Sequence, residues 1–333
     1  MEMKKLNILV TGATGYIGSC LVPALAKEGH KTRCLVRKTS DISRLKGLKN
    51  VEFFYGDTAD PESIAGAAKD MDIVFHLAVL GHLKKGMEED YTRVNISGTK
   101  NIIDEAMRSG VKKIIYTTTS ATLGIINKEI ITEEDAGFPV TDYGRSKFRA
   151  ENEIKNLIKT GSVPVVMLRL THVYGPGEQR DLYKIIKLMK KGIFPQVGLS
   201  ENLYPAVYID DVIQALLKAM EFGKIGETYI ITDAESHDLK DIRKIVNKEL
   251  NRKINIYPVV PKDLTIFMLN VLGKLFSFLG KEPPFSAKNI KSITAGRRFS
   301  IEKAKRELHY NPAVSLEQGL HKTIEYYKKN NLL

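Results

Sequence analysis

Tyr143 and Lys147 are the residues whose types and spacing most directly suggest chemistry. They lie four positions apart in the run Tyr-Gly-Arg-Ser-Lys, so a helix would place the phenol and the ammonium on one face. A tyrosine ordinarily ionises at about pH 10. A neighbouring ammonium favours the phenolate and would move Tyr143 towards acid–base use near neutral pH. The spacing alone is common by chance, so it needs support from elsewhere in the chain.

A run of hydroxyl side chains at 117–120, Thr-Thr-Thr-Ser, follows an apolar strand predicted over Lys113 to Thr117. Parallel sheets bind ligands at the carboxyl ends of their strands. A hydroxyl there can hydrogen-bond a substrate oxygen that changes between carbonyl and alcohol. Asn95 lies on the helix that we predict before this strand, over 92–107. The alternatives are ordinary strand propensity for the threonines and a surface position for Asn95.

A glycine pattern follows the first predicted strand, Leu6 to Val10. Gly12, Gly15 and Gly18 form G-x-x-G-x-x-G, with Thr14, Tyr16 and Ile17 between them. At a strand-to-helix turn the first glycine permits the tight turn, the second lets backbone approach a pyrophosphate, and the third lets the helix pack closely. The helix that follows directs its N–H groups and positive end at the anion. The alternative is a plain glycine-rich turn.

The end of the second strand, predicted over 32–36, indicates which dinucleotide would bind. An acidic residue there would hold the ribose hydroxyls of NAD, but this chain has Arg37 and Lys38. Arginine and lysine pair well with a 2′-phosphate, so we predict NADP(H) in preference to NAD(H). The alternative is that both are solvated charges. Asp57, after the third strand, is expected either to accept from the adenine amino group or to cap a helix.

The elements that would position these residues alternate along the first half of the chain. Strands that are apolar nearly throughout, separated by helical patterns, indicate a parallel sheet covered on both faces, which is a doubly wound α/β domain. We predict a nucleotide-binding domain over 1–175, with contributions from about 205–235, and an interleaved, smaller, mostly helical substrate lobe over 176–333. The six strands predicted in the first part are 6–10, 32–36, 51–55, 73–77, 113–117 and 163–170. In the second part a strand is predicted over 204–209.

Composition limits the class of protein. The 333 residues include 51 Lys and Arg against 39 Asp and Glu, a net charge of +12, and only two cysteines. We therefore expect no disulfide framework, a reducing and cytoplasmic location, and no metal site. The first apolar stretch ends at Thr11 and Gly12, so we expect no signal peptide. The charge alone is weak support for nucleic-acid binding, because no matching motif and no tryptophan accompany it.

These motifs together resemble the extended short-chain dehydrogenase/reductase family over nearly the whole chain. The resemblance implies a Rossmann domain, a nicotinamide cofactor and a Ser/Thr–Tyr–Lys triad. The hydroxyl of the triad then falls on Thr119, with Thr118 and Ser120 as substitutes. Further segments that carry the resemblance are 74–78, 95–101, 116–124, 168–177, 208–212 and 299–312.

The resemblance also implies roles for individual residues. Tyr143 exchanges a proton with the reacting oxygen, Lys147 lowers the pKa of Tyr143 and binds the nicotinamide ribose, and Thr119 orients the substrate. A homodimer through helices 92–107 and 143–159 is implied as well. The expected cofactor contacts are Gly12, Thr14, Gly15, Tyr16, Ile17, Gly18, Arg37, Lys38, Asp57, Thr58, Leu77, Ala78, Asn95, Thr117, Tyr143 and Lys147.

Two positions bear on the substrate. Nucleotide-sugar enzymes of the family commonly carry an Asn and an Arg that contact the diphosphate, and this chain has His172 and Tyr204 there. Arg180 is a nearby cation that could compensate, and His172 could equally be a packed histidine. We therefore expect an NADP(H)-dependent oxidoreductase that interconverts an alcohol and a ketone. The alternatives are a nucleotide-sugar epimerase or dehydratase and a non-catalytic NADP-sensing regulator.

The segment 263–280 is strongly apolar but contains Lys274, and it is too short to span a bilayer well. We expect a core helix of the smaller lobe. The alternatives are an apolar lid over the substrate and a helix lying on a membrane surface.

Overall fold

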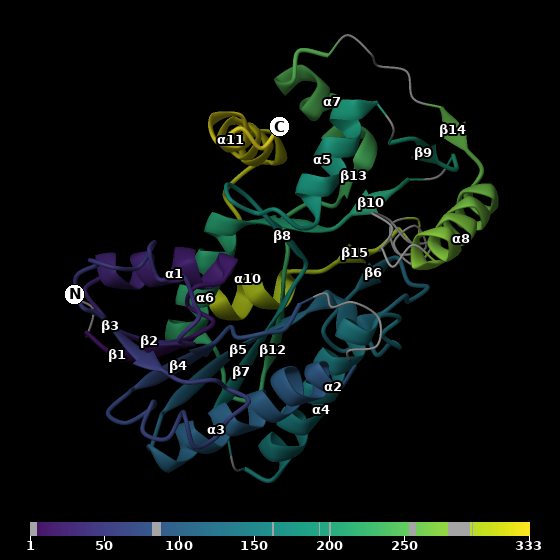
Figure 1. The fold of residues 1–333 in the computed structure, drawn as a ribbon. Helices are drawn as coiled ribbons and strands as arrows, with labels where there is room; N and C mark the ends of the chain where they lie inside the picture. The colour runs from purple at the N-terminus through teal and green to yellow at the C-terminus, as the bar shows by residue number, and fades with distance from the viewer. Residues whose placement is uncertain are drawn as a thin grey trace.

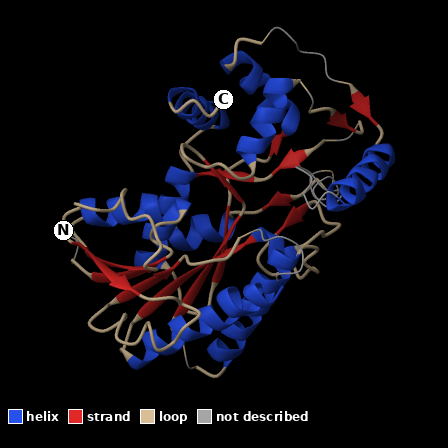
Figure 2. Ribbon diagram, in the orientation of Figure 1, coloured by secondary structure: helices blue, strands red, loops and turns tan. Residues whose placement is uncertain are grey.

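A parallel sheet forms the centre of the molecule (Figures 1 and 2). The computed structural model describes residues 5–81, 88–161, 163–192, 194–199, 201–252, 258–278, 294 and 296–333. Within them, seven strands pair in the order β3-β2-β1-β4-β5-β7-β12, all parallel. The strands are β1 (Asn7–Thr11), β2 (Lys31–Val36), β3 (Val51–Tyr55), β4 (Ile73–His76), β5 (Lys113–Thr119), β7 (Val165–Leu170) and β12 (Thr228–Ile231).

Both faces of the sheet are buried, which explains why its strands read as continuous apolar runs. Alternate residues of β1 enter different cores: Ile8 and Val10 enter one, and Leu9 enters the other. On the first face lie α1 (Tyr16–Lys27), α6 (Ile209–Phe222) and α10 (Glu302–Leu308), and on the second lie α3 (Gly98–Arg108) and α4 (Asp142–Lys159) (Figure 1). The predicted doubly wound α/β fold is confirmed.

The strand order reverses direction beside β1, which has β2 on one side and β4 on the other. Doubly wound sheets bind their ligands outside the carboxyl ends of the strands at this point. The glycine pattern follows β1, and the hydroxyl run ends β5. The fold therefore brings the two predicted chemical motifs to one edge.

The second lobe is mostly helical, as predicted, and stands above that edge in Figure 1. Its helices are α5 (Leu182–Lys191), α7 (Leu239–Glu249), α8 (Lys262–Phe278) and α11 (Leu316–Lys329). Short two-stranded ladders lie outside the seven-stranded sheet. They pair β8 (His172–Tyr174) with β11 (Ala206–Tyr208), β9 (Gln196–Val197) with β14 (Val259–Val260), β10 (Leu203–Tyr204) with β13 (His237–Asp238), and β6 (Ile130–Ile131) with β15 (Arg298–Phe299).

Two predicted elements are interrupted. The helix expected over 92–107 consists of a π-helical segment, Thr92–Ser97, preceded by α2 (Glu88–Tyr91) and continued by α3. The strand expected over 204–209 divides at Pro205 into β10 and β11, because proline has no N–H for a ladder. A 3₁₀ turn, Ser120–Leu123, follows β5.

The core position expected for segment 263–280 is wrong for its described part. The apolar side chains Leu264, Phe267, Met268, Val271, Leu272 and Leu275 on α8 are all exposed. Only the opposite face, which includes Leu269 and Phe276, is half-buried. Residues 279 and 280 lie outside the described part of the chain. No helix within the described residues is long and apolar enough to cross a bilayer.

Candidate active site

The glycine loop leaves no room for side chains at Gly12 and Gly18. Gly12 has a φ of +68°, and a Cβ there would lie 2.7 Å from the Ala78 nitrogen. A Cβ on Gly18 would overlap the Gly12 carbonyl oxygen and lie 2.7 Å from the Ala13 Cα. Gly15 is the N-cap of α1, whose first turn has neither a side-chain cap nor an acidic residue. The loop therefore fits a pyrophosphate at the helix N-terminus.

His76 fixes the neighbouring strand end. Its Nδ1 lies 2.7 Å from the Thr11 hydroxyl, which also accepts from the Ala78 N–H at 3.1 Å. Its Nε2 lies 3.0 Å from the Thr99 hydroxyl. Burial, with a smaller effect of the Lys147 charge, lowers the pKa of His76 to about 3. A neutral His76 thus holds Leu77 and Ala78 against the glycine loop.

Arg37 and Lys38 lie at the carboxyl end of β2, where the sequence places them. Both side chains are exposed, and the Arg37 N–H donates to the Ser40 hydroxyl at 3.2 Å. Neither cation has an ion-pair partner among the described residues. They are therefore available to an anionic group at this edge.

Asp57 and Thr58, two further predicted cofactor contacts, follow β3. An Asp57 carboxylate oxygen accepts from the Ala59 N–H at 2.9 Å, which closes a turn rather than capping a helix. Thr58 is buried, and its carbonyl accepts from Asn101 on α3 at 2.9 Å. Contact of either residue with adenine stays a prediction.

The three predicted catalytic residues meet at the end of β5. Thr141 caps α4 by accepting from the Gly144 N–H at 3.0 Å, and Tyr143 and Lys147 follow on that helix. The Thr119 hydroxyl lies close enough to that of Tyr143 for hydrogen bonding to lower the pKa of Tyr143. The Lys147 ammonium donates to the Thr117 carbonyl at 2.8 Å and lies 4.1 Å from the centre of the Tyr116 ring. Of the candidate hydroxyls, the geometry thus favours Thr119.

In the protein alone the pKa of Tyr143 is raised, and its expected lowering by Lys147 stays a prediction. Burial and the Asp181 charge raise the pKa of Tyr143 to about 12, although the Arg180 charge and the Thr119 hydrogen bond oppose them. Burial lowers the pKa of Lys147 to about 7, although the Glu151 carboxylate opposes this. The physical reason is that both groups are desolvated and Lys147 directs its ammonium at Thr117 and Tyr116.

A buried ion pair behind Lys147 was not predicted. Glu151 lies one turn beyond Lys147 on α4 and accepts from Arg169 Nη2 and from the Thr118 hydroxyl, both at 2.7 Å. Both charged side chains are almost completely buried. The Thr118 hydroxyl is therefore used in binding Glu151 and is not directed at a substrate at the end of β5. The four-residue spacing places Glu151 on the same face of the helix as Lys147, but no signal in the sequence joins it to Arg169.

Asn95 is buried in the π-helical segment, not on the helix surface. It holds the loop after β4 by accepting from the Leu80 N–H at 2.8 Å and donating to the Leu80 carbonyl at 3.0 Å. It also donates to the Ser146 hydroxyl on α4 at 2.9 Å. Asn95 therefore connects the loop after β4 to the helix that carries Tyr143 and Lys147.

Two of the predicted substrate residues, His172 and Tyr204, lie against each other. The His172 ring stacks on that of Tyr204, with centroids 4.6 Å apart, and His172 Nδ1 lies 3.5 Å from an Asp181 carboxylate oxygen. Tyr204 is buried, whereas His172 is partly exposed. Arg180 is exposed and close enough for its charge to act on Tyr143.

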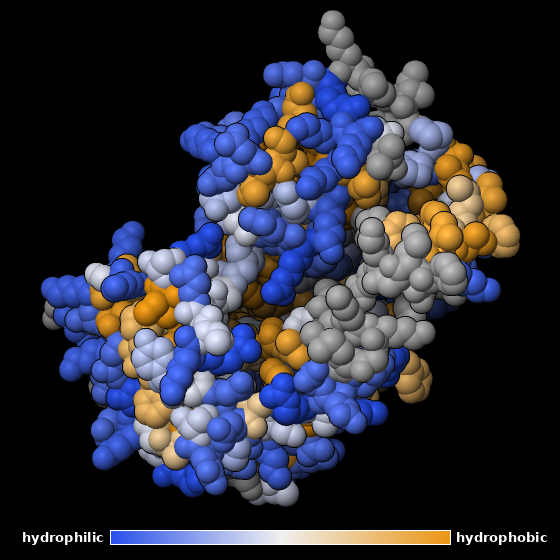
Figure 3. Space-filling model, in the orientation of Figure 1, coloured by the Kyte–Doolittle hydropathy of each residue, from blue (hydrophilic) through white to orange (hydrophobic). Residues whose placement is uncertain are grey.

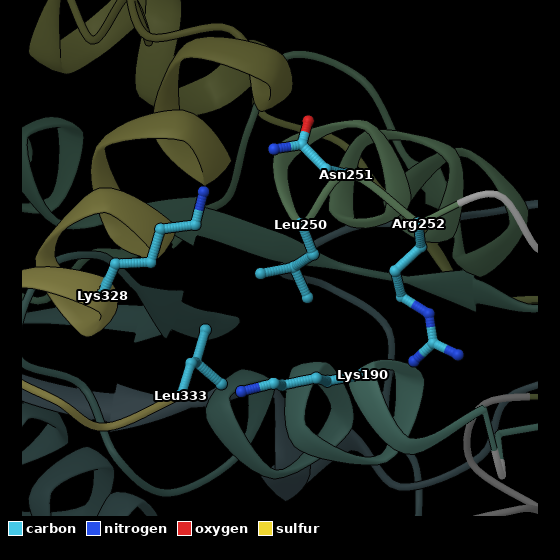
Figure 4. Close-up of a pocket in the computed structure, with 6 residues that line it drawn as sticks. All are labelled: Lys190, Leu250, Asn251, Arg252, Lys328 and Leu333. Carbon is cyan, nitrogen blue, oxygen red and sulfur yellow. The ribbon is translucent and has the colours of Figure 1, made fainter.

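The surface is hollowed between the sheet domain and the second lobe in Figure 3. A separate pocket belongs to the second lobe alone and is lined by Lys190, Leu250, Asn251, Arg252, Lys328 and Leu333 (Figure 4). Two of its cations already have partners, because Arg252 donates to the Met189 carbonyl at 2.8 Å and Lys328 donates to the Glu249 carbonyl. It does not include the strand edge that carries the chemical groups.

Comparison with known proteins identifies the family. A model of the NAD dependent epimerase/dehydratase family matches residues 8–232. The chain is 25% identical to a 3-beta-hydroxysteroid dehydrogenase of Mycolicibacterium neoaurum, over 96% of this chain and 91% of that protein. Its fold matches the crystal structure of gox2253 with a TM-score of 0.82 and 30% identity, over 97% of this chain and 98% of that one.

A second solved structure is the UDP-glucuronic acid 4-epimerase from Bacillus cereus in complex with NAD. It matches with a TM-score of 0.76 and 25% identity, over 98% of this chain and 99% of that one. The resemblance seen in the sequence is thereby confirmed. This chain belongs to the NAD dependent epimerase/dehydratase family, within the extended short-chain dehydrogenases/reductases, and is an NAD(P)-dependent oxidoreductase or epimerase.

Proposed function

We propose that the protein is an NADP(H)-dependent oxidoreductase that interconverts an alcohol and a ketone. The observation that carries this proposal is the meeting of Thr119, Tyr143 and Lys147 at the strand edge that also bears the glycine loop. A proton donor, a second hydroxyl and a cation at one point are what reduction of a carbonyl requires.

Each side chain has a separate task. In the reducing direction the Tyr143 hydroxyl gives its proton to the carbonyl oxygen, while the Thr119 hydroxyl donates a hydrogen bond to that oxygen. The pKa of Tyr143, raised to about 12, keeps the group protonated at neutral pH but makes it a weaker acid than a free tyrosine. Lys147, when charged, stabilises the phenolate that remains. A nicotinamide cofactor, when bound, supplies or accepts the hydride.

The preference for NADP(H) is supported by Arg37 and Lys38. Their exposed cations at the end of β2, without ion-pair partners among the described residues, suit a 2′-phosphate better than two ribose hydroxyls. Gly12, Gly15 and Gly18 would hold the pyrophosphate.

An apolar ketone is favoured over a nucleotide sugar by the His172–Tyr204 pair. These two aromatic rings stand where the sugar enzymes commonly carry polar groups for a diphosphate, and Tyr204 is buried. The similar 3-beta-hydroxysteroid dehydrogenase acts, by its name, on an apolar alcohol. Arg180 near Tyr143 and the similar UDP-glucuronic acid 4-epimerase favour the second candidate, a nucleotide-sugar epimerase.

A substrate panel separates these functions. The purified protein is incubated with NADPH or NADH and with cyclic, steroidal and long-chain ketones, and in parallel with UDP- and dTDP-sugars. We expect NADPH oxidation with apolar ketones and little with sugars. Interconversion of sugars without NADPH consumption would establish the epimerase instead. Tight NADPH binding without turnover of any compound would favour the regulator.

A further inference from the structure

Helix α8 presents an uncovered apolar stripe, which we call the α8 face: Leu264, Phe267, Met268, Val271, Leu272 and Leu275. The spacing of these residues places them along one side of a helix. Each is between 40% and 65% exposed. Figure 3 shows this helix as an apolar area at the edge of the second lobe. Such a contiguous group is unlike the scattered apolar residues of ordinary surfaces.

Two further exposed apolar side chains lie on or beside the ladder that precedes α8. Val259, which pairs in β14 with β9, is 52% exposed, and Leu199, just after β9, is 89% exposed. The Gly198 N–H donates to the Val260 carbonyl at 2.9 Å, which holds these two segments together. The other side of α8, with Ile266, Leu269 and Phe276, is half-buried. The helix is thus attached on one side and open on the other.

Positive charge is concentrated in the same part of the chain. Residues 251–298 contain nine Lys and Arg against two Asp and Glu, which is more than half of the net +12. Lys262 and Lys274 lie on α8 itself and are exposed. An apolar helix face flanked by lysines is the pattern of a helix that lies in a membrane interface. Basic residues attract the anionic headgroups of such a surface.

We propose that the α8 face inserts into the interfacial region of a lipid bilayer that carries anionic headgroups. The helix then lies along the surface, because its 17 residues do not meet the length and hydropathy of a span. Charge also disfavours a second copy of the chain as the occupant, since pairing two α8 faces would bring Lys262 and Lys274 of each copy together. The inference does not depend on the substrate or the cofactor.

Vesicle co-sedimentation of the full chain tests this surface. We expect binding to vesicles of equal parts phosphatidylcholine and phosphatidylglycerol, and weaker binding to phosphatidylcholine alone. The double variant Phe267→Ser/Leu275→Ser should bind at least about tenfold more weakly, because it loses two apolar side chains that would enter the bilayer. Ile225→Ser is the matched control, since Ile225 is 55% exposed but lies outside the α8 face.

Charge is tested separately. Lys262→Glu and Lys274→Glu should each weaken binding to the anionic vesicles by about fivefold or more, and Lys240→Glu on α7 should not. Equal binding by the wild type and the Phe267→Ser/Leu275→Ser variant would overturn the proposal, as would failure of the wild type to bind either vesicle. Light scattering measures the oligomeric state of the same variants. If the substitutions abolish self-association and leave vesicle binding unchanged, a second copy of the chain covers the α8 face and the proposal is overturned. NADPH oxidation without vesicles reports separately on the proposed function.

Discussion

Tyr143 differs from phenylalanine by the one hydroxyl that the proposed reaction uses. Tyr143→Phe should lower kcat by about 10²–10⁴-fold, the usual contribution of a positioned acid, and leave NADPH affinity nearly unchanged. Steady-state kinetics and a fluorescence titration measure the two quantities. Thr119→Ser, which keeps a hydroxyl, should retain most activity, whereas Thr119→Val should not. Substantial turnover by Tyr143→Phe would remove Tyr143 from the mechanism.

Glu151 influences the reaction through Lys147. Its carboxylate raises the pKa of Lys147, which burial lowers to about 7. Because the charged ammonium is the useful form, activity should fall as pH rises through that pKa. Glu151→Gln removes the opposing charge and leaves Arg169 uncompensated, so the fall should move to lower pH. The pH dependence of kcat/KM measures the shift.

A control separates this electrostatic effect from lost stability. Removing one partner of a buried ion pair costs about 3–5 kcal/mol, so folding of Glu151→Gln is checked by circular dichroism. The double variant Glu151→Gln/Arg169→Met removes both charges and should shift the pH profile less. Identical pH profiles for the wild type and Glu151→Gln would show that Glu151 is only structural.

Arg37 is expected to select the dinucleotide. A charge-assisted contact with a 2′-phosphate contributes about 1.5–3 kcal/mol. Arg37→Asp should therefore lower the preference for NADPH over NADH by at least about tenfold, because the new carboxylate repels the phosphate and accepts from ribose hydroxyls. The ratio of kcat/KM for the two cofactors measures this preference, with Lys69→Asp as a charge-matched control. An unchanged ratio would refute the role of Arg37.

At the scale of elements, the start of α1 depends on close packing that only glycine allows. A Cβ on Gly18 would meet the backbone of Gly12 and Ala13, and backbone cannot yield as a side chain can. Gly18→Ala should cost about 1–3 kcal/mol of stability and weaken cofactor binding. Urea denaturation measures the first and dinucleotide titration the second. Gly273→Ala on α8, where a Cβ meets nothing within 4 Å, should be neutral or stabilising.

The elements of the sheet could be predicted from sequence because burial on both faces forces an apolar run. The interruption at Thr92–Ser97 could not, since a π-helical turn leaves the pattern of apolar residues nearly unchanged. The π-helical segment is explained by tertiary contacts, because it places Asn95 within hydrogen-bond distance of Leu80 and Ser146. The exposure of α8 was missed for a related reason. An apolar stripe predicts contact with something, but it does not say whether that partner belongs to the same chain.

The candidate site divides in the same way. Tyr143, Lys147 and the glycines are local patterns, so their spacing in the sequence is also their spacing in space. The Glu151–Arg169 pair joins α4 to β7, and the His172–Tyr204 stack joins β8 to β10. Such pairs depend on which elements become neighbours. Neither the composition nor the order of residues in a single sequence shows which helices and strands become neighbours in the fold.

At the scale of the whole molecule, one apolar core joins the two lobes. It includes Ile8 of β1, Leu182 of α5 and Tyr327 of α11, and Asp211 on α6 accepts from the Ala313 N–H at 2.9 Å. We therefore expect a single cooperative thermal transition. A cofactor held at the edge between the lobes should stabilise both together. At a concentration 100 times its dissociation constant, NADPH adds about 2.7 kcal/mol, which should raise the Tm by several degrees, and NADH at the same concentration should raise it less. Scanning calorimetry tests this expectation: two transitions, of which NADPH shifts only one, would show that the lobes unfold separately.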